Sequence, residues 1–342
     1  MTKRKNVLIA GIGGASLGIE ILKCLVLAKR YNIFGCDISE FAYGHYQNEF
    51  KKTFLVDREK YIDNILELCL EYNISYIIPG GEEPMVLLGK KIEVFKAKGI
   101  EIVGNSQKII NNFSNKEKTF KILSSNGFQV PLTIAPSNHE ELNKMKFPCV
   151  IKPSTGSGGS VFVFLVKNFK EAKLYVDYLT KLGKSVIAQE YISHNEGEFT
   201  VGVLSSKKQE IIGSIVLKRL FHTKLSVLLK SEIGLLSTGY SQGLIDRFPL
   251  VQETCEEIAK SIGSEGPLNI QGRIKDNKFI PFEINPRFSA STYLRALANF
   301  NEIDIYLNYL ITNIFSEKIN IKPGYYLRSF SEKFIEKNNV KK

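Results

Sequence analysis

The sequence predicts an α/β domain with a parallel sheet over residues 1–105, followed by an α+β region with antiparallel sheets over residues 106–320. Strand and helix patterns alternate with short links through the first hundred residues, which is typical of a parallel sheet covered by helices. After that, two helical stretches follow each other and strands are joined by short polar turns, which predict hairpins. Hydrophobic residues make up 44% of the 342 and recur along nearly the whole length. This amount suffices for two or three cores and excludes disorder for the bulk.

The first domain opens with the apolar run Val7–Ala10, which glycines follow at once. The basic start before it resembles a signal peptide only superficially, because the apolar stretch is far too short, so we expect a first strand and a mature chain that begins here. The expected strands are Val7–Ala10, Asn32–Cys36, Ser75–Ile78 and Glu101–Val103, and the expected helices are Ser16–Lys29, Tyr61–Tyr72 and Met85–Lys98.

Beyond Ser106 we expect two further units and a tail. The unit 106–188 contains helices at Gln107–Phe113, Lys116–Asn126 and Phe169–Leu182, with strands at Val130–Ile134, Cys149–Lys152, Val161–Val166 and Val186–Tyr191. The unit 189–320 contains strands at Glu198–Ser205, Glu210–Lys218, Asn269–Lys275 and Lys278–Ile284, with helices at Leu250–Ile262 and Tyr293–Phe315. The tail 321–342 is expected to be loosely held.

Composition excludes several classes of protein. No apolar run reaches about 18 residues, so no transmembrane helix is expected. The five cysteines are scattered and odd in number, which favours reduced thiols in a cytoplasmic protein, and the four scattered histidines give a zinc site little support. The net charge of +11 comes mostly from diffuse lysine without a nucleic-acid-binding motif. We therefore expect a solvated basic surface that would also suit an anionic nucleotide or substrate, with neither nucleic acid nor membrane as a partner.

A glycine-rich loop, Gly11–Gly18, follows the first strand and opens a helix, a context that suits phosphate binding. Asp37 ends the second strand, where a dinucleotide fold places its ribose ligand. Ser16 occupies the third glycine position, however, so the G-x-G-x-x-G pattern is incomplete. Phosphate binding and a purely structural tight turn both remain open.

A second loop combines a fixed cation with many small residues. Lys152 ends an apolar strand, and seven of the eight residues from Ser154 to Val161 are Gly, Ser or Thr. Free backbone amides in such a loop can wrap phosphate oxygens, which favours phosphate contact over a merely flexible hairpin. It is not a P-loop, because no Gly-Lys-Ser/Thr follows the glycines.

The expected strand Val186–Tyr191 carries a carboxylate, Glu190, near its end and could line an adenine pocket with its main chain, while Glu198 could take ribose hydroxyls. The expected hairpin near the C-terminus carries the most telling pattern. Glu283 and Asn285 are two apart on one strand and share a face, and Gln271 on the preceding strand can join them. Oxygen ligands so arranged suit Mg²⁺ held between protein and triphosphate, and Arg287 just beyond could stabilise a transferring phosphoryl group.

Together these motifs resemble the ATP-grasp superfamily, and most closely its branch with the synthetase halves of carbamoyl-phosphate synthase and biotin carboxylase. The resemblance covers residues 105–315, and the domain before it resembles the pre-ATP-grasp domain of that family. It implies a two-subdomain ATP-grasp fold, with a small subdomain that carries a lid and a C-terminal antiparallel subdomain. The implied nucleotide-binding residues are Lys116, Lys152, the lid residues Ser154, Gly156, Ser157, Gly158, Gly159 and Ser160, the hinge residues Gln189, Glu190, Tyr191 and Ile192, and Glu198 at the ribose.

The resemblance also implies a function: an ATP-dependent carboxylate–amine ligase that works through an acyl phosphate, with ATP and Mg²⁺ (or Mn²⁺) as cofactors. Gln271, Glu283 and Asn285 match the metal positions, and Arg287 and Lys152 would be catalytic. Small carboxylates and amines are the expected partners, with a homodimer common in the family. The candidate substrate contacts are Glu82, Glu83, Lys218, Arg219, Ser289, Ser291 and Arg295. Glu82 and Glu83 could equally lie at the N-terminus of a helix and stabilise it through the helix dipole.

Three alternatives remain open. A unit that phosphorylates bicarbonate or carbamate, like half of a carbamoyl-phosphate synthase, would use the same residues. A nicotinamide-dependent oxidoreductase would use the Gly11–Gly18 loop and Asp37. A non-catalytic ATP-binding module would have kept the fold without the catalytic activity.

Overall fold

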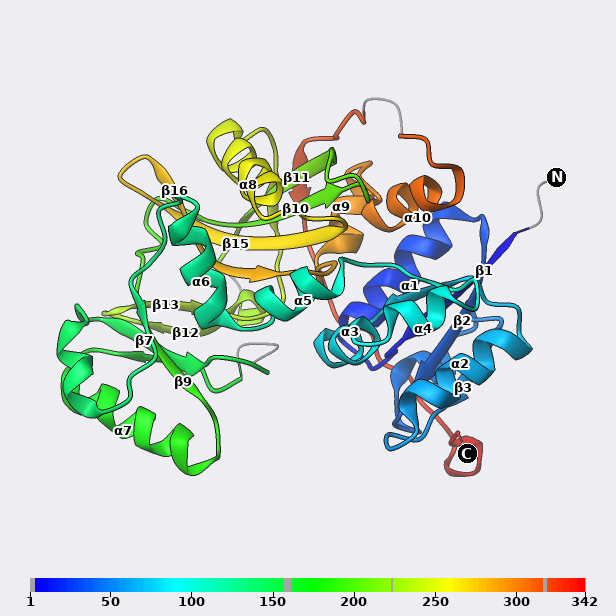
Figure 1. Cartoon of the computed structure of the whole chain (residues 1–342), viewed down its shortest axis with the longest axis horizontal. Coiled ribbons are helices and arrows are strands. Elements are labelled where there is room, and N and C mark those ends of the chain that lie inside the picture. The colour runs from blue at the N-terminus through cyan, green and yellow to red at the C-terminus, as the bar shows by residue number, and fades with distance from the viewer. Residues whose placement is uncertain (1–3, 157–160, 223, 316–318, 342) are drawn as a thin grey trace.

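The structure, a computed structural model, describes residues 4–156, 161–222, 224–315 and 319–341. Figure 1 shows the first domain on the right, a small lobe with α7 on the left, and a larger antiparallel sheet that connects them above. The expected order, an α/β domain followed by antiparallel units, is confirmed.

The first sheet is parallel throughout and has the strand order β3-β2-β1-β4-β5. Its strands are β1 (Lys5–Ala10), β2 (Tyr31–Asp37), β3 (Lys52–Leu55), β4 (Tyr76–Pro79) and β5 (Glu101–Ile102), and its helices are α1 (Leu17–Ala28), α2 (Tyr61–Glu71), α3 (Glu82–Gly89) and α4 (Ile92–Lys96). Val7 and Ile9 pack towards α1, whereas Leu8 and Ala10 pack towards α2 and α4. The strand order reverses direction between β1 and β4, where open α/β sheets bind their ligands.

Two details of this domain differ from expectation. The strand β3 is not predicted by the sequence, because it is only four residues long and follows a long irregular segment. The expected single helix Met85–Lys98 is two helices, α3 and α4. The first ends at Gly89, because glycine has a low helix propensity.

The second sheet is antiparallel, with strand order β6-β9-β7-β8 and α7 (Phe169–Lys181) packed on one face. Its strands are β6 (Thr133–Ile134), β7 (Cys149–Pro153), β8 (Phe164–Val166) and β9 (Val186–Glu190). The expected boundary between residues 188 and 189 falls inside β9, whose pairing with β7 continues from Val186 to Glu190. The strand therefore stays with this sheet to its end.

The third sheet has six strands in the order β16-β15-β10-β11-β14-β17. Its strands are β10 (Glu198–Ser205), β11 (Ile211–Arg219), β14 (Gly243–Ile245), β15 (Pro267–Lys275), β16 (Lys278–Asn285) and β17 (Gly324–Tyr326), and a separate hairpin pairs β12 (Val227–Ser231) with β13 (Gly234–Ser237). One face packs on α8 (Pro249–Ser261) and on α5 (Gln107–Phe113) and α6 (Lys116–Ser125). These last two helices were expected in the second unit, but their buried faces belong to the core of the third sheet.

The other face of the third sheet shares a core with the first domain through α1 and the helices α9 (Thr292–Leu297) and α10 (Glu302–Thr312). The sequence predicted one helix over Tyr293–Phe315; the chain instead breaks at Asn299, which has a left-handed φ of 69°. Because one continuous core joins α1 to the third sheet, the first domain is fixed against it.

The tail is not loosely held as expected over its described part. β17 pairs with β14, and Arg328 then forms a nearly buried ion pair of 3.0 Å with Glu20 on α1. Phe330 packs edge-on against Tyr240, with the ring centroids 5.1 Å apart. The sequence gives little sign of these contacts, because the segment lacks strand periodicity and its partners lie far away in the chain.

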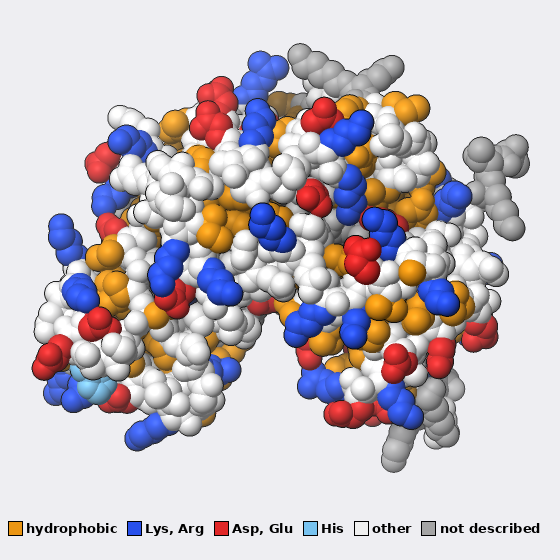
Figure 2. Space-filling model, in the orientation of Figure 1, with side chains coloured by type: hydrophobic (Ala, Val, Ile, Leu, Met, Phe, Trp, Pro, Cys, Tyr) orange, Lys and Arg blue, Asp and Glu red, His pale blue; other side chains and the backbone are white. Residues whose placement is uncertain are grey.

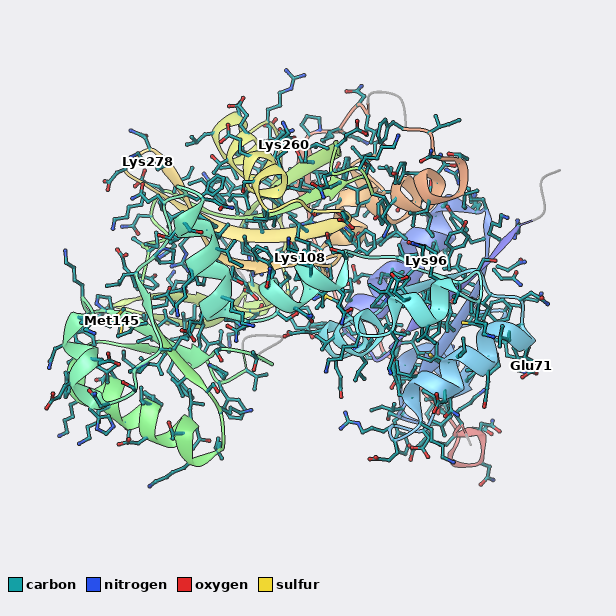
Figure 3. All side chains as sticks on the ribbon, in the orientation of Figure 1. Glu71, Lys96, Lys108, Met145, Lys260 and Lys278 are labelled. Carbon is teal, nitrogen blue, oxygen red and sulfur yellow. The ribbon has the colours of Figure 1, made fainter. Side chains whose placement is uncertain are left out.

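All five cysteines are unpaired and buried, as the sequence predicts. No helix in the described part of the chain is long and apolar enough to cross a membrane. Figure 2 shows lysine and arginine mixed with acidic side chains over the face in view. The exposed lysines Lys96, Lys108, Lys260 and Lys278, labelled in Figure 3, come from four separate elements. On this face the positive charge is spread, as the diffuse distribution of lysine in the sequence leads one to expect.

Candidate active site

A cavity of about 500 Å³ lies where the three units meet. It is lined by the loops after β1 and β4 in the first domain, by β7 and β9 in the small lobe, and by β15 and β16 of the third sheet. Figure 2 shows the molecule hollowed between the small lobe and the first domain. Most of the motifs singled out in the sequence contribute to this one cavity.

The hairpin β15–β16 supplies three oxygen-bearing side chains on one face. Gln271 lies directly opposite Glu283 in the register, and Asn285 lies two residues further along. The Gln271 amide donates to one Glu283 oxygen at 3.1 Å, and the Asn285 amide donates to the other at 3.2 Å. All three residues line the cavity.

This donor set fits Mg²⁺ better than a softer metal. It offers one carboxylate and two amide oxygens, the hard ligands that Mg²⁺ takes, once the two amides turn their oxygens towards the ion. No group of three His, Cys, Asp or Glu that could hold a metal occurs among the described residues. A single carboxylate leaves half of the charge of the ion to be balanced by another anion, as triphosphate oxygens would do.

Lys152, at the end of β7, is buried beside the hairpin. Its ammonium donates to Gln189 Oε1 at 2.8 Å and lies 3.5 Å from the carbonyl oxygen of Phe282. Burial, together with the positive charge of Lys116, lowers the pKa of Lys152 to about 7, although Glu283 opposes the shift. The Lys116 backbone N–H donates to the Ser154 carbonyl at 2.9 Å, which ties the start of α6 to the loop after β7. The fold thus brings two lysines from distant segments to one place, where an anion would relieve their repulsion.

The glycine-rich loop is only partly described. Ser154 is buried and donates its backbone N–H to the Ser185 carbonyl at 2.9 Å, and Gly156 has a φ of +63°, which favours glycine. Neither residue is among those that line the cavity. The expected lid residues Ser157, Gly158, Gly159 and Ser160 lie outside the described residues.

The four expected hinge residues, from Gln189 to Ile192, all line the cavity beside apolar side chains such as Val150 and Leu236. Behind them lies Arg273, which sequence reasoning missed. Its guanidinium lies 4.9 Å from the Tyr191 ring centroid and 5.5 Å from that of Phe282. It also donates to the Ile192 and Leu235 carbonyls, so it holds the hinge backbone in place. Its spacing of two from Gln271 on the same strand could have pointed to it.

Glu198, the expected ribose contact, does not line the cavity. It is fully buried, and its carboxylate forms ion pairs of 3.1 Å with Arg219 and 2.7 Å with Arg273. Burial alone would raise the pKa of Glu198, but the two arginines hold it below its ordinary value. The structure thus gives this carboxylate the role of a buried counter-ion.

Of the expected substrate contacts, only Glu82 and Ser289 line the cavity. Arg219 and Arg295 are fully buried in ion pairs, and Ser291 forms a hydrogen bond with Ser289. Lys218 lies over the Phe199 ring. Glu83 forms an ion pair with Arg58 on the surface. The sequence did not reveal the environments of these side chains, because each environment is formed by residues far away in the chain. The cavity lining also includes Ser16 of the Gly11–Gly18 loop, and Tyr240, which the sequence did not single out.

Arg287, just beyond β16, also lines this part of the cavity. Its Nη1 donates to the Phe288 carbonyl at 2.9 Å, whereas its buried Nε has no hydrogen-bond partner among the described residues. Burial lowers the pKa of Arg287, and the negative charges of Glu82 and Glu283 oppose that shift. Arg287 therefore adds a positive charge to the cavity lining, and its buried Nε is a donor left without a partner among the described residues.

The Gly11–Gly18 loop shows a structural use for its residues. A Cβ at Gly18 would lie 1.9 Å from the Gly11 carbonyl oxygen, so the close packing requires glycine. Asp37 accepts the Ile12 backbone N–H at 2.7 Å and that of Ser39 at 3.1 Å. Both Asp37 oxygens thus hold the main chain, which favours the tight-turn interpretation.

The chain is similar in sequence and in fold to several known proteins. The chain is 25% identical over 235 residues to a carbamoyl phosphate synthase large chain of Neisseria meningitidis serogroup B, which covers 67% of this chain and 21% of that one. The curated relatives match this chain over less than half of their own length. Among solved structures, the biotin carboxylase domain of Hydrogenobacter thermophilus 2-oxoglutarate carboxylase has a TM-score of 0.70 at 15% identity, covering 95% of this chain and 74% of that one. The L-amino acid ligase of Bacillus licheniformis has a TM-score of 0.67 at 17% identity, covering 91% and 75%.

Two family models match the chain in succession. A PylC-like N-terminal domain matches residues 7–103, which span the first parallel sheet. An ATP-grasp domain matches residues 113–291, more than half of the chain, and includes both lysines, the hinge and the hairpin. The chain therefore belongs to the ATP-grasp family.

Proposed function

We propose that the chain is an ATP-dependent carboxylate–amine ligase, which forms an amide through an acyl phosphate and releases ADP and phosphate. One observation carries the proposal: a single cavity joins an apolar hinge, two lysines, an oxygen-donor hairpin and a partly unpaired arginine. That succession matches a nucleotide whose base, phosphates and transferred phosphoryl group lie end to end.

The base end is formed by the hinge from Gln189 to Ile192, whose main chain would read the edge of adenine. The phosphates would lie at Lys152 and Lys116, whose mutual repulsion they would relieve. Gln271, Glu283 and Asn285 would hold Mg²⁺, or Mn²⁺ in its place. When bound, that ion would neutralise charge on the phosphate oxygens during transfer.

At the other end Arg287 would hold the substrate carboxylate and then the acyl phosphate. A carboxylate oxygen attacks the terminal phosphorus of ATP, and ADP leaves with the electrons of the broken P–O bond. The amine nitrogen then attacks the acyl carbon, and phosphate leaves. The fixed cations stabilise charge that develops on oxygen, so positioning and electrostatics carry the catalysis.

The names of similar proteins support this class of reaction, since they include an L-amino acid ligase and carbamoyl phosphate synthase large chains. The Hydrogenobacter structure contains MgADP and bicarbonate. The carbamoyl phosphate synthase relatives and the bicarbonate in that structure also favour a second candidate, a unit that phosphorylates bicarbonate or carbamate. We further propose small carboxylates and amines as partners. A cytoplasmic location fits the five unpaired cysteines. A homodimer is also proposed, because the Hydrogenobacter domain is named as a dimer.

The test is ADP release with Mg-ATP across a panel of carboxylic acids and bicarbonate, with hydroxylamine present to trap an acyl phosphate. A hydroxamate formed from one acid supports the ligase and identifies the acid. ADP release that needs bicarbonate alone supports the kinase unit instead. Absence of both, with ATP binding intact, would overturn the ligase proposal in favour of a non-catalytic module. A thermal-shift titration with NAD tests the oxidoreductase alternative.

A further inference from the structure

Glu82 stands apart from the other carboxylates of the cavity. It begins α3 directly after β4, at the edge of the first sheet where the strand order reverses, and it lines the cavity with Gly80 and Gly81. Among the described residues, no hydrogen bond or ion pair involves its carboxylate. Glu190, also in the lining, pairs with Lys275 at 2.9 Å. Glu283 accepts from both amides of the hairpin.

The next residue in the chain shows how different this environment is. Glu83 points to the surface, where it pairs with Arg58 at 3.1 Å and 61% of its side chain is exposed. Glu82 instead lines the same cavity as Arg287, which follows directly after β16. The cavity lining therefore combines a negative group from the first domain with a positive group from the end of the third sheet.

A substrate carboxylate would be attracted by Arg287 and repelled by Glu82, whereas a protonated amine would be attracted by Glu82 and repelled by Arg287. The two substrates of a ligase carry these opposite charges. We propose that Glu82 binds the ammonium form of the amine substrate and accepts its proton as the carbon–nitrogen bond forms. This assignment rests on the proposed ligase function and names a primary amine or ammonia as the second substrate.

The proton must go somewhere because the amine arrives protonated. Amino groups have pKa values of about 8 to 10, so near neutral pH most of the nitrogen lone pairs are occupied by a proton. In the proposed step a nitrogen-bound proton passes to the Glu82 carboxylate while the lone pair forms the bond to the acyl carbon. The bond from that carbon to the phosphate oxygen breaks, and phosphate leaves with the electron pair and with the second proton that the nitrogen loses, as hydrogen phosphate. Glu82 then returns the first proton to water, so both protons lost by the ammonium group are accounted for.

Hydroxylamine separates this step from the activation of the acid. It is a weak base and is largely uncharged near neutral pH, so its lone pair can attack an acyl phosphate without first giving up a proton, and the departing phosphate takes the one proton that nitrogen loses. The experiment compares wild type, Glu82→Gln, Glu82→Asp and the neighbouring control Glu83→Gln. Each variant is supplied with Mg-ATP and the acid found in the panel. The nucleophile is either hydroxylamine or an amine from a set of ammonia and the common amino acids.

We expect Glu82→Gln to form hydroxamate at about the wild-type rate, since acid activation is intact. Amide formation should fall by about 10²- to 10⁴-fold, the usual contribution of general base catalysis, and should recover as the pH rises and free amine becomes available. Glu82→Asp, which keeps the carboxylate, should retain part of the amide activity, and Glu83→Gln should match wild type in both assays.

Amide formation by Glu82→Gln at the wild-type rate would overturn the assignment while leaving the ligase function intact. Equal loss of hydroxamate and amide in a variant with an unchanged melting temperature would also overturn it, because Glu82 would then serve acid activation. If Glu82→Gln fails to fold, Glu82→Asp decides: amide formation that falls no more than hydroxamate formation counts against the role. A wild-type protein that gives no hydroxamate from any acid overturns the ligase function itself, and the assignment with it.

Discussion

Replacement of Lys152 by Met should weaken ATP binding and remove most of the pH dependence of the ATP affinity. The pKa of Lys152 is about 7 in the protein without nucleotide, because burial and Lys116 disfavour its charged form. Phosphate oxygens beside the ammonium would raise that pKa again, so ATP binding must take up a proton wherever the free lysine is neutral. Above about pH 7 this uptake costs about 1.4 kcal/mol per pH unit, which is a tenfold loss of affinity per unit.

The assay is isothermal titration calorimetry with Mg-ADP and Mg-ATP at several pH values from about 7 to 9, in buffers of different ionisation enthalpy. Wild type should take up close to one proton per nucleotide near pH 8.5, and the Kd should rise about tenfold per pH unit. Lys152→Met should bind more weakly at pH 7 and show little proton uptake. Lys121→Met, which removes an exposed lysine of α6 paired with Glu117, is the matched control and should behave as wild type.

The same pKa has a consequence for stability with a definite sign. Between about pH 7 and the ordinary lysine pKa of 10.5, unfolded Lys152 holds a proton that the folded protein lacks. The free energy of unfolding should therefore increase with pH in that window for wild type relative to Lys152→Met. Equal pH slopes for nucleotide affinity in the two proteins, or no proton uptake by wild type, would refute the reasoning.

Three further predictions concern the rest of the site. Arg287→Ala should leave the Kd for ATP unchanged but lower turnover by about 10²- to 10³-fold, as loss of an oxyanion donor does, and a fully active variant would remove Arg287 from the mechanism. Glu283→Gln should raise the Mg²⁺ concentration for half-maximal ADP release by at least about tenfold, whereas an unchanged metal titration would contradict its role. Glu198→Gln should lower the free energy of unfolding by about 3–5 kcal/mol in denaturant titrations, because Arg219 and Arg273 would lose their buried counter-ion. A stable variant that binds ATP poorly would instead support the expected ribose contact.

Local chemistry made part of the site predictable. Alternation along a strand is fixed by backbone geometry, so Glu283 and Asn285 had to share a face, and the short turn after Lys275 brought Gln271 opposite them. Likewise, Lys152 ends an apolar strand before a loop of small residues, which places it at a sheet edge wherever that sheet packs. Such features depend on residues within about a dozen positions of each other.

Partners that lie far apart in the chain decided the rest. Glu198 carries the same side chain as any candidate ligand, but Arg219 and Arg273 reach it from two other strands and make it a buried counter-ion. Edge strand β17 exists because β14 offers it unpaired backbone groups.

The sequence by itself determined the order of the folding units, the family resemblance and the hairpin with its oxygen donors, since periodicity and short motifs express local physics. Only the tertiary structure decided between Glu82 and Glu83, neighbours of identical chemistry. One lines the same cavity as Arg287 and the other pairs with Arg58 in solvent. The physical reason is that burial and electrostatic field are set by everything packed around a residue, and that environment is assembled from the whole chain.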